Sequence, residues 1–266
     1  LYPDSKSGSE DIYPDIGGLR KWITRDNLKN IGAAFNQTVK GLAADKIEDR
    51  LASAIVMRRF LDEGTEYGVG GAPFAKTAVS VISAILKHAP TSDFQKVLAD
   101  SLAHAPEHCL IKGDFQRANF AKAYLGKINL EGSDFFQANL SGASLKGAIL
   151  SKAVFREATL NQTVFRDAKL QGANFDMATL QSVNFSGADL TGATFDGATL
   201  REVDFRGAIL DGTVFTNTAG YGNIGVDSAI SASNQVPIHK RIFLSRPGQL
   251  DSRQLLFVES TKDILK

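Results

Sequence analysis

A five-residue period that runs without interruption from Phe115 to Phe215 most constrains what this chain can fold into. Each of 21 consecutive positions at this spacing holds Phe or Leu, and in 14 cases the residue two positions earlier is Ala. A period of five fits neither the 3.6 residues of a helical turn nor the two-residue alternation of a flat strand. Repetition at a short fixed period is instead typical of a solenoid, in which each unit packs on its neighbours.

The repeated units have the form small-x-[Phe/Leu]-x-x, as in residues 138–142, 173–177 and 188–192. They resemble the consensus A-[DN]-[LF]-x-x of the pentapeptide-repeat family, over the whole stretch from Phe115 to Phe215. This resemblance implies an α+β fold dominated by a right-handed quadrilateral β-helix, with one unit on each of four sides. It also implies that the small residue and the central Phe or Leu point inward, and that the other three residues of each unit point outward.

A second, longer period tests this arrangement within the sequence, because four units per coil would stack every fourth unit on the same side. One such column of central residues holds only Phe and another holds only Leu. At a strand spacing of roughly 4.8 Å, about five coils make a rod roughly 25 Å long. We predict that ladders of stacked Phe rings fill its interior without voids. The predicted core ladder consists of Phe115, Phe135, Phe155, Phe175, Phe195 and Phe215.

The rest of the chain divides around this repeat. Residues 1–16 are rich in Ser, Gly, Pro and acidic residues and predict a disordered lead-in. Residues 17–109 predict a small helical domain that caps the solenoid of residues 110–215, because an open solenoid exposes backbone edges at its ends. Residues 216–266 are expected to form a second cap or a segment for homodimer contact.

Within the helical domain, apolar spacing and capping residues predict individual helices. Ser92 is expected to cap a helix with Gln95 three residues later, and Asp45 with Glu48 has the same spacing. Two helices separated by a glycine-rich segment resemble a HEAT-like antiparallel pair. The expected helices cover 19–28, 46–61, 74–88 and a segment that begins after residue 92 and ends at Pro106.

Charge excludes several classes of protein. The formal net charge is +1, and residues 111–215 hold 11 basic and 11 acidic side chains. No region is strongly basic, so we expect no nucleic-acid partner. The longest apolar stretch, near 78–86, is too short to span a bilayer. A membrane anchor that preceded Leu1 would lie outside this sequence.

Few residues combine into a motif for chemistry. His104, His108 and Cys109 lie close in sequence, but Pro106 interrupts the helical spacing that could hold a metal. Residues 68–71 are rich in glycine and lack the Lys-Ser/Thr of a phosphate loop. We therefore predict no metal, no cofactor and no catalytic residue. The acidic residues that directly precede central positions are expected to be structural; they are Asp114, Asp134, Asp189 and Asp204.

The outer faces of the solenoid are the predicted functional surface. Basic residues that share one column could meet an anionic partner, and apolar residues at usually polar positions are a candidate contact patch. The basic residues are Lys146, Arg166 and Arg206, with Ser186 interrupting the column. The apolar residues are Phe136, Ile149, Val154 and Val164.

Flat faces without an evident pocket favour a non-enzymatic interaction or scaffold protein with an unidentified protein partner. Many proteins that the chain resembles are bacterial, and some carry membrane helices upstream. A single cysteine fits a reducing compartment, so we expect the cytoplasm. One alternative is a DNA mimic that binds type II topoisomerases, like the quinolone-resistance branch of the family; it needs an acidic rod, and this one is neutral. The other alternative is an enzyme or ligand-binding activity in the helical domain.

Overall fold

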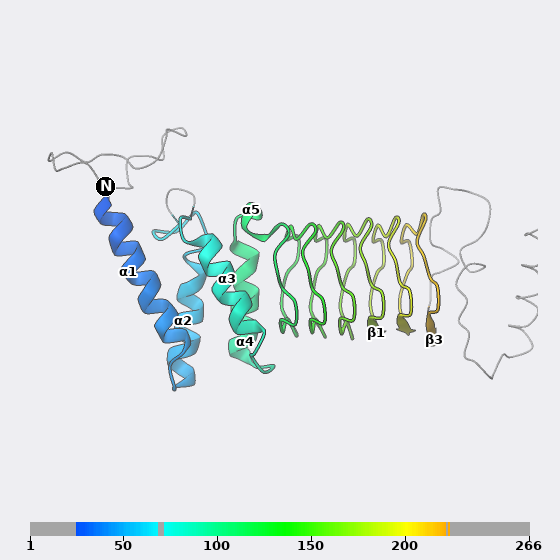
Figure 1. Ribbon diagram of the computed structural model, residues 1–266, viewed down its shortest axis with the longest axis horizontal. Coiled ribbons are helices and arrows are strands. Elements are labelled where there is room, and N and C mark those ends of the chain that lie inside the picture. Colours follow the sequence, from blue (N-terminus) through cyan, green and yellow to red (C-terminus); the bar gives the residue numbers. More distant parts are fainter. Residues whose placement is uncertain (1–24, 69–71, 222, 224–266) are drawn as a thin grey trace, which may run out of the picture.

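The computed structural model describes residues 25–68, 72–221 and 223, which form a bundle of helices followed end to end by a straight rod (Figure 1). The predicted disordered lead-in and nearly all of the C-terminal segment lie outside the described residues. Among the described residues, no helix combines the length and the hydropathy needed to cross a lipid bilayer.

The helical part is longer and begins differently than the sequence predicts. At 18 residues, α1 is the longest of the described helices. The sequence pattern predicted only a short helix at 19–28, of which residues 19–24 lie outside the described part. In α1 the buried residues Ile31, Phe35 and Leu42 are separated by Gly, Asn and Gln, which weakens the periodic signal. The elements are α1 (Arg25–Leu42), α2 (Ile47–Arg58), α3 (Ala75–Leu86), α4 (Asp93–Ser101), a 3-10 turn (Leu102–His104) and α5 (Glu107–Leu110).

Only one of the two predicted helix caps forms. The Ser92 hydroxyl accepts a hydrogen bond from the backbone N–H of Gln95, at 3.2 Å, and begins α4 as expected. Asp45 does not cap α2, because the N-cap residue is Lys46 and no side chain bonds there. The prediction was wrong by one residue, and an aliphatic lysine side chain cannot accept a hydrogen bond from the free N–H groups of the first turn.

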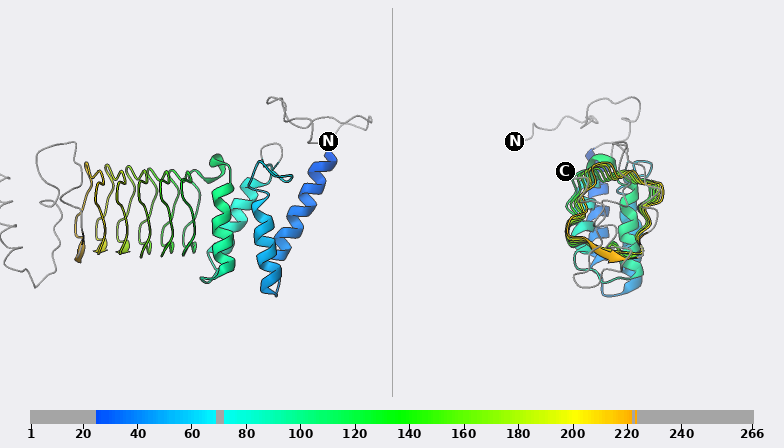
Figure 2. Two further views of the ribbon diagram at one scale, coloured as in Figure 1. Left: turned by 180° about the vertical axis from the view of Figure 1, so that it is seen from behind. Right: turned by 90° about the vertical axis from the view of Figure 1, so that its right-hand side faces the viewer.

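The rod is a four-sided coil in which every fourth unit stacks on the same side. Each isolated backbone bridge joins residues that are 20 apart and parallel, such as Asn174 with Thr194. Seen end-on, successive coils superpose on one closed outline (Figure 2, right). We name the sides by their first unit: side A begins with 113–117, side B with 118–122, side C with 123–127 and side D with 128–132. Sides A and C are therefore opposite each other.

Each backbone N–H of a unit has its own partner, and this explains the consensus. In 173–177 the first N–H closes a turn, the second bonds to the preceding coil, and the third and fifth bond to the following coil. The fourth, that of Asp176, bonds to the side-chain oxygen of Asn174 at 2.8 Å. An Asn or Asp just before the central residue thus satisfies the one N–H that the coil leaves free.

The interior of the rod contains the ring stacks expected from the longer period. Neighbouring rings of the Phe115–Phe215 column lie 4.7 to 5.3 Å apart between centroids, at interplanar angles of 7° to 20°. From Phe165 onward, side C adds a second Phe stack that meets the first edge-on; Phe175 and Phe185, for example, are 5.5 Å apart at 82°. Such offset and edge-on contacts stabilise aromatic cores beyond their buried area.

The corners of the coil require a left-handed backbone at the last residue of each unit. Nine glycines have φ between +64° and +71° there, and other residues such as Lys152 and Gln162 adopt φ near +60°. Glycine reaches this region without strain, whereas other residues bear a cost.

Gly192→Ala should destabilise the rod by about 1 to 2 kcal/mol, the cost of placing a Cβ at a left-handed position. The φ of Gly192 is +68°, and nothing lies within 4 Å of the added Cβ, so strain alone is measured. The control Gln162→Ala alters a corner that already carries a side chain at φ 58°, and it should change the free energy of unfolding by less than about 0.5 kcal/mol. If Gly192→Ala and Gln162→Ala lower the free energy of unfolding in urea by the same amount, backbone strain at the left-handed corner is not the cause.

The helices bond directly to the edge of the first coil. The backbone N–H of Asn119, which would bond to a preceding coil, donates to the carbonyl of Leu86 at 2.9 Å. The buried side chain of Gln95 donates through Nε2 to the carbonyls of Asn119 and Ala121, at 2.8 and 3.3 Å. The helical part therefore supplies the hydrogen-bond partners that another coil would have supplied.

Pairing of the coils continues past the last Phe of the period. Three short parallel strands line side B: β1 (Thr179–Gln181), β2 (Thr199–Arg201) and β3 (Ala219–Tyr221). Gly220 takes the central position and pairs with Leu200. An added Cβ on Gly220 would lie 1.6 Å from the Leu200 carbonyl oxygen, so this side ends with a close backbone approach that only glycine permits.

Candidate interaction surfaces

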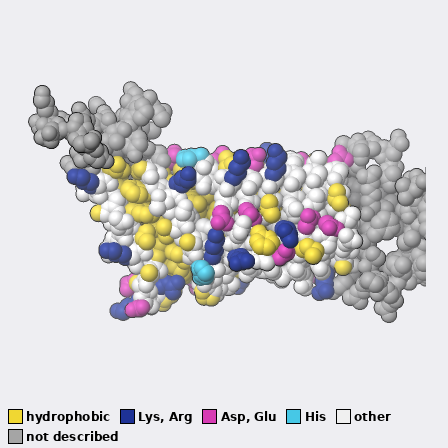
Figure 3. Space-filling model, in the orientation of Figure 1, with side chains coloured by type: hydrophobic (Ala, Val, Ile, Leu, Met, Phe, Trp, Pro, Cys, Tyr) yellow, Lys and Arg dark blue, Asp and Glu magenta, His cyan; other side chains and the backbone are white. Residues whose placement is uncertain are grey.

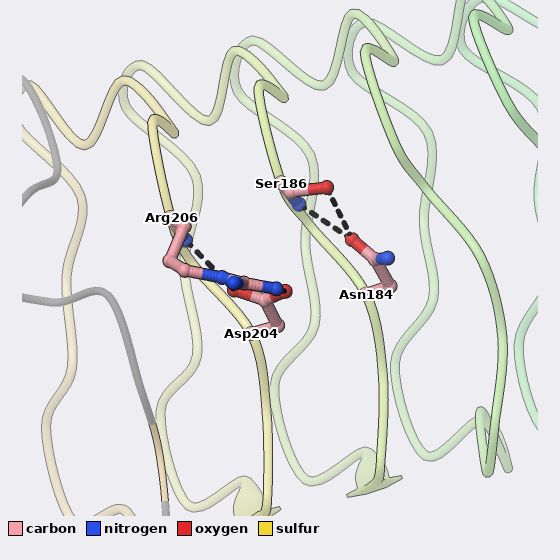
Figure 4. A network of polar contacts seen from close by, with 4 residues as sticks. All are labelled: Asn184, Ser186, Asp204 and Arg206. Atoms are coloured by element: carbon pink, nitrogen blue, oxygen red, sulfur yellow. Dashed lines mark hydrogen bonds and ion pairs between the residues drawn. The ribbon is translucent and has the colours of Figure 1, made fainter.

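Most acidic residues just before central positions are used by the fold itself. Asp114, Asp134, Asp189 and Asp204 each accept a hydrogen bond from the backbone N–H two residues later, at 2.9 to 3.1 Å, which confirms their predicted structural role. Figure 4 shows this bond at Asp204 and, one coil earlier, at Asn184 with Ser186. These carboxylates are therefore committed to turns.

Asp204 also holds the guanidinium of Arg206 in a two-point contact, with nitrogen–oxygen distances of 2.9 and 2.7 Å (Figure 4). The hydrogen bonds from Arg206 lower the pKa of Asp204, against the opposing effect of burial. The basic residue is thus neutralised by its own turn.

Acidification should weaken the rod partly through Asp204. Because its pKa in the folded state is below the unfolded value of about 3.9, the carboxylate stabilises the fold above that pH. This contribution disappears as the pH falls through the folded pKa. Asp204→Asn keeps an acceptor oxygen for the turn, so its unfolding free energy should fall less than that of the parent between about pH 5 and 3. If the parent and Asp204→Asn lose the same free energy of unfolding between these two pH values in urea titrations, Asp204 does not provide this stabilisation.

The three predicted basic residues do share one column, on side C, but they do not form an unbalanced positive stripe. Arg206 is paired with Asp204, and Arg166 lies 3.4 Å from the carboxylate of the neighbouring Asp167. Of the three, only Lys146 lacks an ion-pair partner among the described residues. Local pairing reduces the field that this column could offer an anionic partner.

The four predicted apolar residues do not form one patch. Phe136 and Val154 lie on side A, in neighbouring coils, and the guanidinium of Arg156 lies over the Phe136 ring at 5.6 Å. Ile149 lies on side D, and Val164 lies on side C, opposite Val154. All four side chains are partly buried. The patch interpretation was wrong because the four residues lie on three different sides of the coil, and Val154 and Val164, two units apart, face opposite directions.

Side A instead gathers further apolar residues that the sequence analysis missed. Met177 is 59% exposed and Val214 is 40% exposed, and both lie on this side. Along the rod face of Figure 3, apolar, acidic and basic side chains alternate at short range. The coil register would have revealed both residues, because each occupies an outward position with an apolar side chain. Side A therefore carries four outward apolar residues, Phe136, Val154, Met177 and Val214, whereas side C carries Val164 and Tyr124, which is 63% exposed.

His104, His108 and Cys109 do not converge on a metal site. Among the described residues, no three or more His, Cys, Asp or Glu side chains are placed to hold a metal ion. Burial and the nearby Arg58 lower the pKa of His104, and burial raises the pKa of Cys109. A raised pKa keeps the Cys109 thiol protonated, which disfavours a nucleophilic role.

Comparison with known proteins identifies the repeat. A family model for pentapeptide repeats matches residues 114–151, and a second, for a pentapeptide repeat region, matches residues 139–215. The chain belongs to the pentapeptide-repeat family. This pentapeptide-repeat protein has the right-handed quadrilateral β-helix of the family, preceded by a helical part that neither model covers.

Several solved structures are similar to this pentapeptide-repeat protein. HetL, involved in heterocyst differentiation regulation in the cyanobacterium Nostoc sp. strain PCC 7120, is 32% identical over 46% of this chain, with a TM-score of 0.32. The match spans 61% of the length of HetL. A second Nostoc pentapeptide repeat protein is 33% identical over 36% of this chain and 74% of its own length, with a TM-score of 0.16.

The plasmid-mediated fluoroquinolone resistance protein QnrB1 is 19% identical over 57% of this chain and 90% of its own length, with a TM-score of 0.25. No curated protein sequence matches this pentapeptide-repeat protein.

Proposed function

We propose that this protein is a non-enzymatic scaffold whose rod, of about five coils, presents side A to a protein partner. The observation that carries the proposal is the gathering of outward apolar residues on that side. They are Phe136, Val154, Met177 and Val214. In this proposal residues 17–109 cap the rod, residues 110–215 bind, residues 216–266 form a second cap or a homodimer contact, and the compartment is the cytoplasm.

The chemistry of side A supports a protein partner. Exposed apolar groups next to an arginine over an aromatic ring are typical of the residues that contribute most at protein interfaces. Stacked coils hold these side chains on a rigid frame, which reduces the entropy lost on binding. Side C is the weaker candidate surface, because its two arginines are paired with neighbouring carboxylates. If side C binds a partner, we propose that Lys146, Arg166 and Arg206 make the contacts.

A DNA-mimic role is less well supported. Such a mimic would need the negative charge of a duplex, whereas residues 111–215 hold equal numbers of basic and acidic residues. We therefore expect no protection of gyrase from quinolones by stoichiometric amounts of this protein.

The proposal is tested by affinity capture from the source organism with side-specific variants. Phe136→Ser with Met177→Asn alters side A, and Asn tolerates the left-handed φ of 61° at position 177. Lys146→Gln with Arg166→Gln alters the opposite side and serves as the control. Loss of an aromatic contact at an interface costs about 2 kcal/mol or more, so the side A variant should bind the captured protein at least about 30-fold more weakly.

The control variant should retain the captured protein at parental affinity. Retention by the side A variant together with loss by the control would assign binding to side C instead. Equal binding by the parent and both variants would refute the use of either side.

A further inference from the structure

A cavity of about 490 Å³ lies where α3, the α5 turn and the first coil of the rod meet. Three lysines line it. Lys76 lies in α3, Lys87 lies at the C-terminal end of α3, and Lys112 lies at the first corner of the rod. Two histidines, His88 and His108, also line it. Figure 3 shows Lys, Arg and His side chains gathered at this border between the helices and the rod. These five basic side chains come from three separate segments of the chain, so no sequence motif predicts that they lie together.

The cavity has more positive charge than its own acid can neutralise. In the part of the chain that the structure describes, Asp114 is the only acidic residue that lines it, and its carboxylate already pairs with Lys87 at 2.9 Å. Burial opposes ionisation of Asp114, but the hydrogen bonds from Lys87 and Gln116 hold its pKa below the usual range. Among the described residues, Lys76 and Lys112 have no ion-pair partner.

The remaining walls combine hydroxyl groups with an apolar floor. Ser80 lies one turn along α3 from Lys76, and the Ser83 hydroxyl donates to the Asp114 carbonyl at 2.6 Å. Val79 and Phe115 are buried beneath them. Burial and, to a smaller extent, the negative charge of Glu63 raise the pKa of the Cys109 thiol against the opposing effect of Lys76, so the thiol itself adds no negative charge beside the lysines.

We propose that this junction cavity binds a phosphomonoester, with Lys76 and Lys112 pairing with the phosphate and the apolar floor contacting the organic group. A phosphomonoester carries close to two negative charges at neutral pH, which matches two unpaired lysines. Lysine binds phosphate as a point charge with three N–H donors. The volume lies within the range of small-molecule sites. This inference is independent of side A and of the proposed function.

The test is a calorimetric titration of the full chain with phenyl phosphate, a phosphomonoester with a small apolar group. Benzoate, with the same ring and a single negative charge, is the matched ligand. Saturable binding of one phenyl phosphate per chain is expected, at least about tenfold tighter than benzoate. In Lys76→Gln with Lys112→Gln the affinity should fall at least about tenfold, since charge-assisted hydrogen bonds to two lysines are lost.

Lys122→Gln with Lys127→Gln provides the control, because both lysines lie at corners outside the cavity. This variant should bind phenyl phosphate like the parent, and thermal unfolding should show that both variants are folded. Absence of saturable binding at millimolar phenyl phosphate, or equal affinity in the Lys76/Lys112 variant and the parent, would overturn the proposal.

A second arm distinguishes the source of the phosphate. Sedimentation with phosphatidylcholine vesicles that contain phosphatidic acid would indicate a lipid headgroup if the Lys76/Lys112 variant no longer sediments. Binding of phenyl phosphate without vesicle sedimentation would indicate a free phosphomonoester. Either result supports the site, whereas vesicle sedimentation that the Lys76/Lys112 variant retains would contradict a lipid headgroup in this cavity.

Discussion

Phe175→Asp is expected to unfold the rod as a unit. The Phe175 ring is fully buried between Phe155 and Phe195, at centroid distances of 4.9 and 4.7 Å, and it meets Phe185 edge-on. The substitution removes these contacts and places a carboxylate where no partner exists, which together should cost about 5 kcal/mol or more. Circular dichroism during urea titration should show loss of the native baseline at concentrations where the parent is folded.

Two controls separate burial of charge from charge itself. Phe175→Leu keeps an inward apolar residue of the kind that the repeat uses elsewhere, and should cost about 1 to 2 kcal/mol. Asn139→Asp adds the same carboxylate at an outward position, where the side-chain oxygen accepts from the Ser141 N–H and the bridged residues of the neighbouring coils are uncharged, and it should be nearly neutral. If Phe175→Asp melts like the parent, the inward assignment is wrong.

Gln95→Ala is expected to weaken the junction between the helices and the rod. Gln95 is fully buried, and its side-chain amide is the donor for the carbonyls of Asn119 and Ala121. Leaving buried carbonyls without partners should cost about 2 to 4 kcal/mol for the pair. Hydrogen exchange should then accelerate first in the coil that begins near Asn119, before the later coils open.

Gln37→Ala is the matched control, because it makes the same substitution at an exposed position of a helix, α1. It should leave the free energy of unfolding unchanged or slightly raised, since Ala has the higher helix propensity. Equal effects of the two substitutions would show that helix propensity, and not the junction bonds, determines the result.

The rod could be predicted in detail because each unit obeys a local rule. The period determines which residues face inward, and the Asn or Asp before the central residue satisfies a backbone N–H of its own unit, as Asp204 does. The same rule assigns Met177 and Val214 to outward positions, so this part of the candidate surface was also accessible from the sequence.

The helical part and the junction were less predictable because tertiary contacts decide them. Gln95 has the spacing of a capping residue, yet its side chain is recruited by the edge of the first coil. The length of α1 depends on isolated apolar residues that pack against segments distant in the sequence, as Phe35 does against Phe60 and Phe74. The junction cavity joins Lys76 to Lys112, from a helix and a corner far apart in the sequence, and nothing local in the sequence indicates that they meet.

The central claim, that one flat side of the rod binds a protein partner, is tested most directly by hydroxyl-radical footprinting of the complex with the captured partner. Side-chain protection should recur from coil to coil on side A, at Phe136, Met177 and Val214, and should be absent on side C. Protection confined to the helices, or equal protection on sides A and C, would contradict the claim.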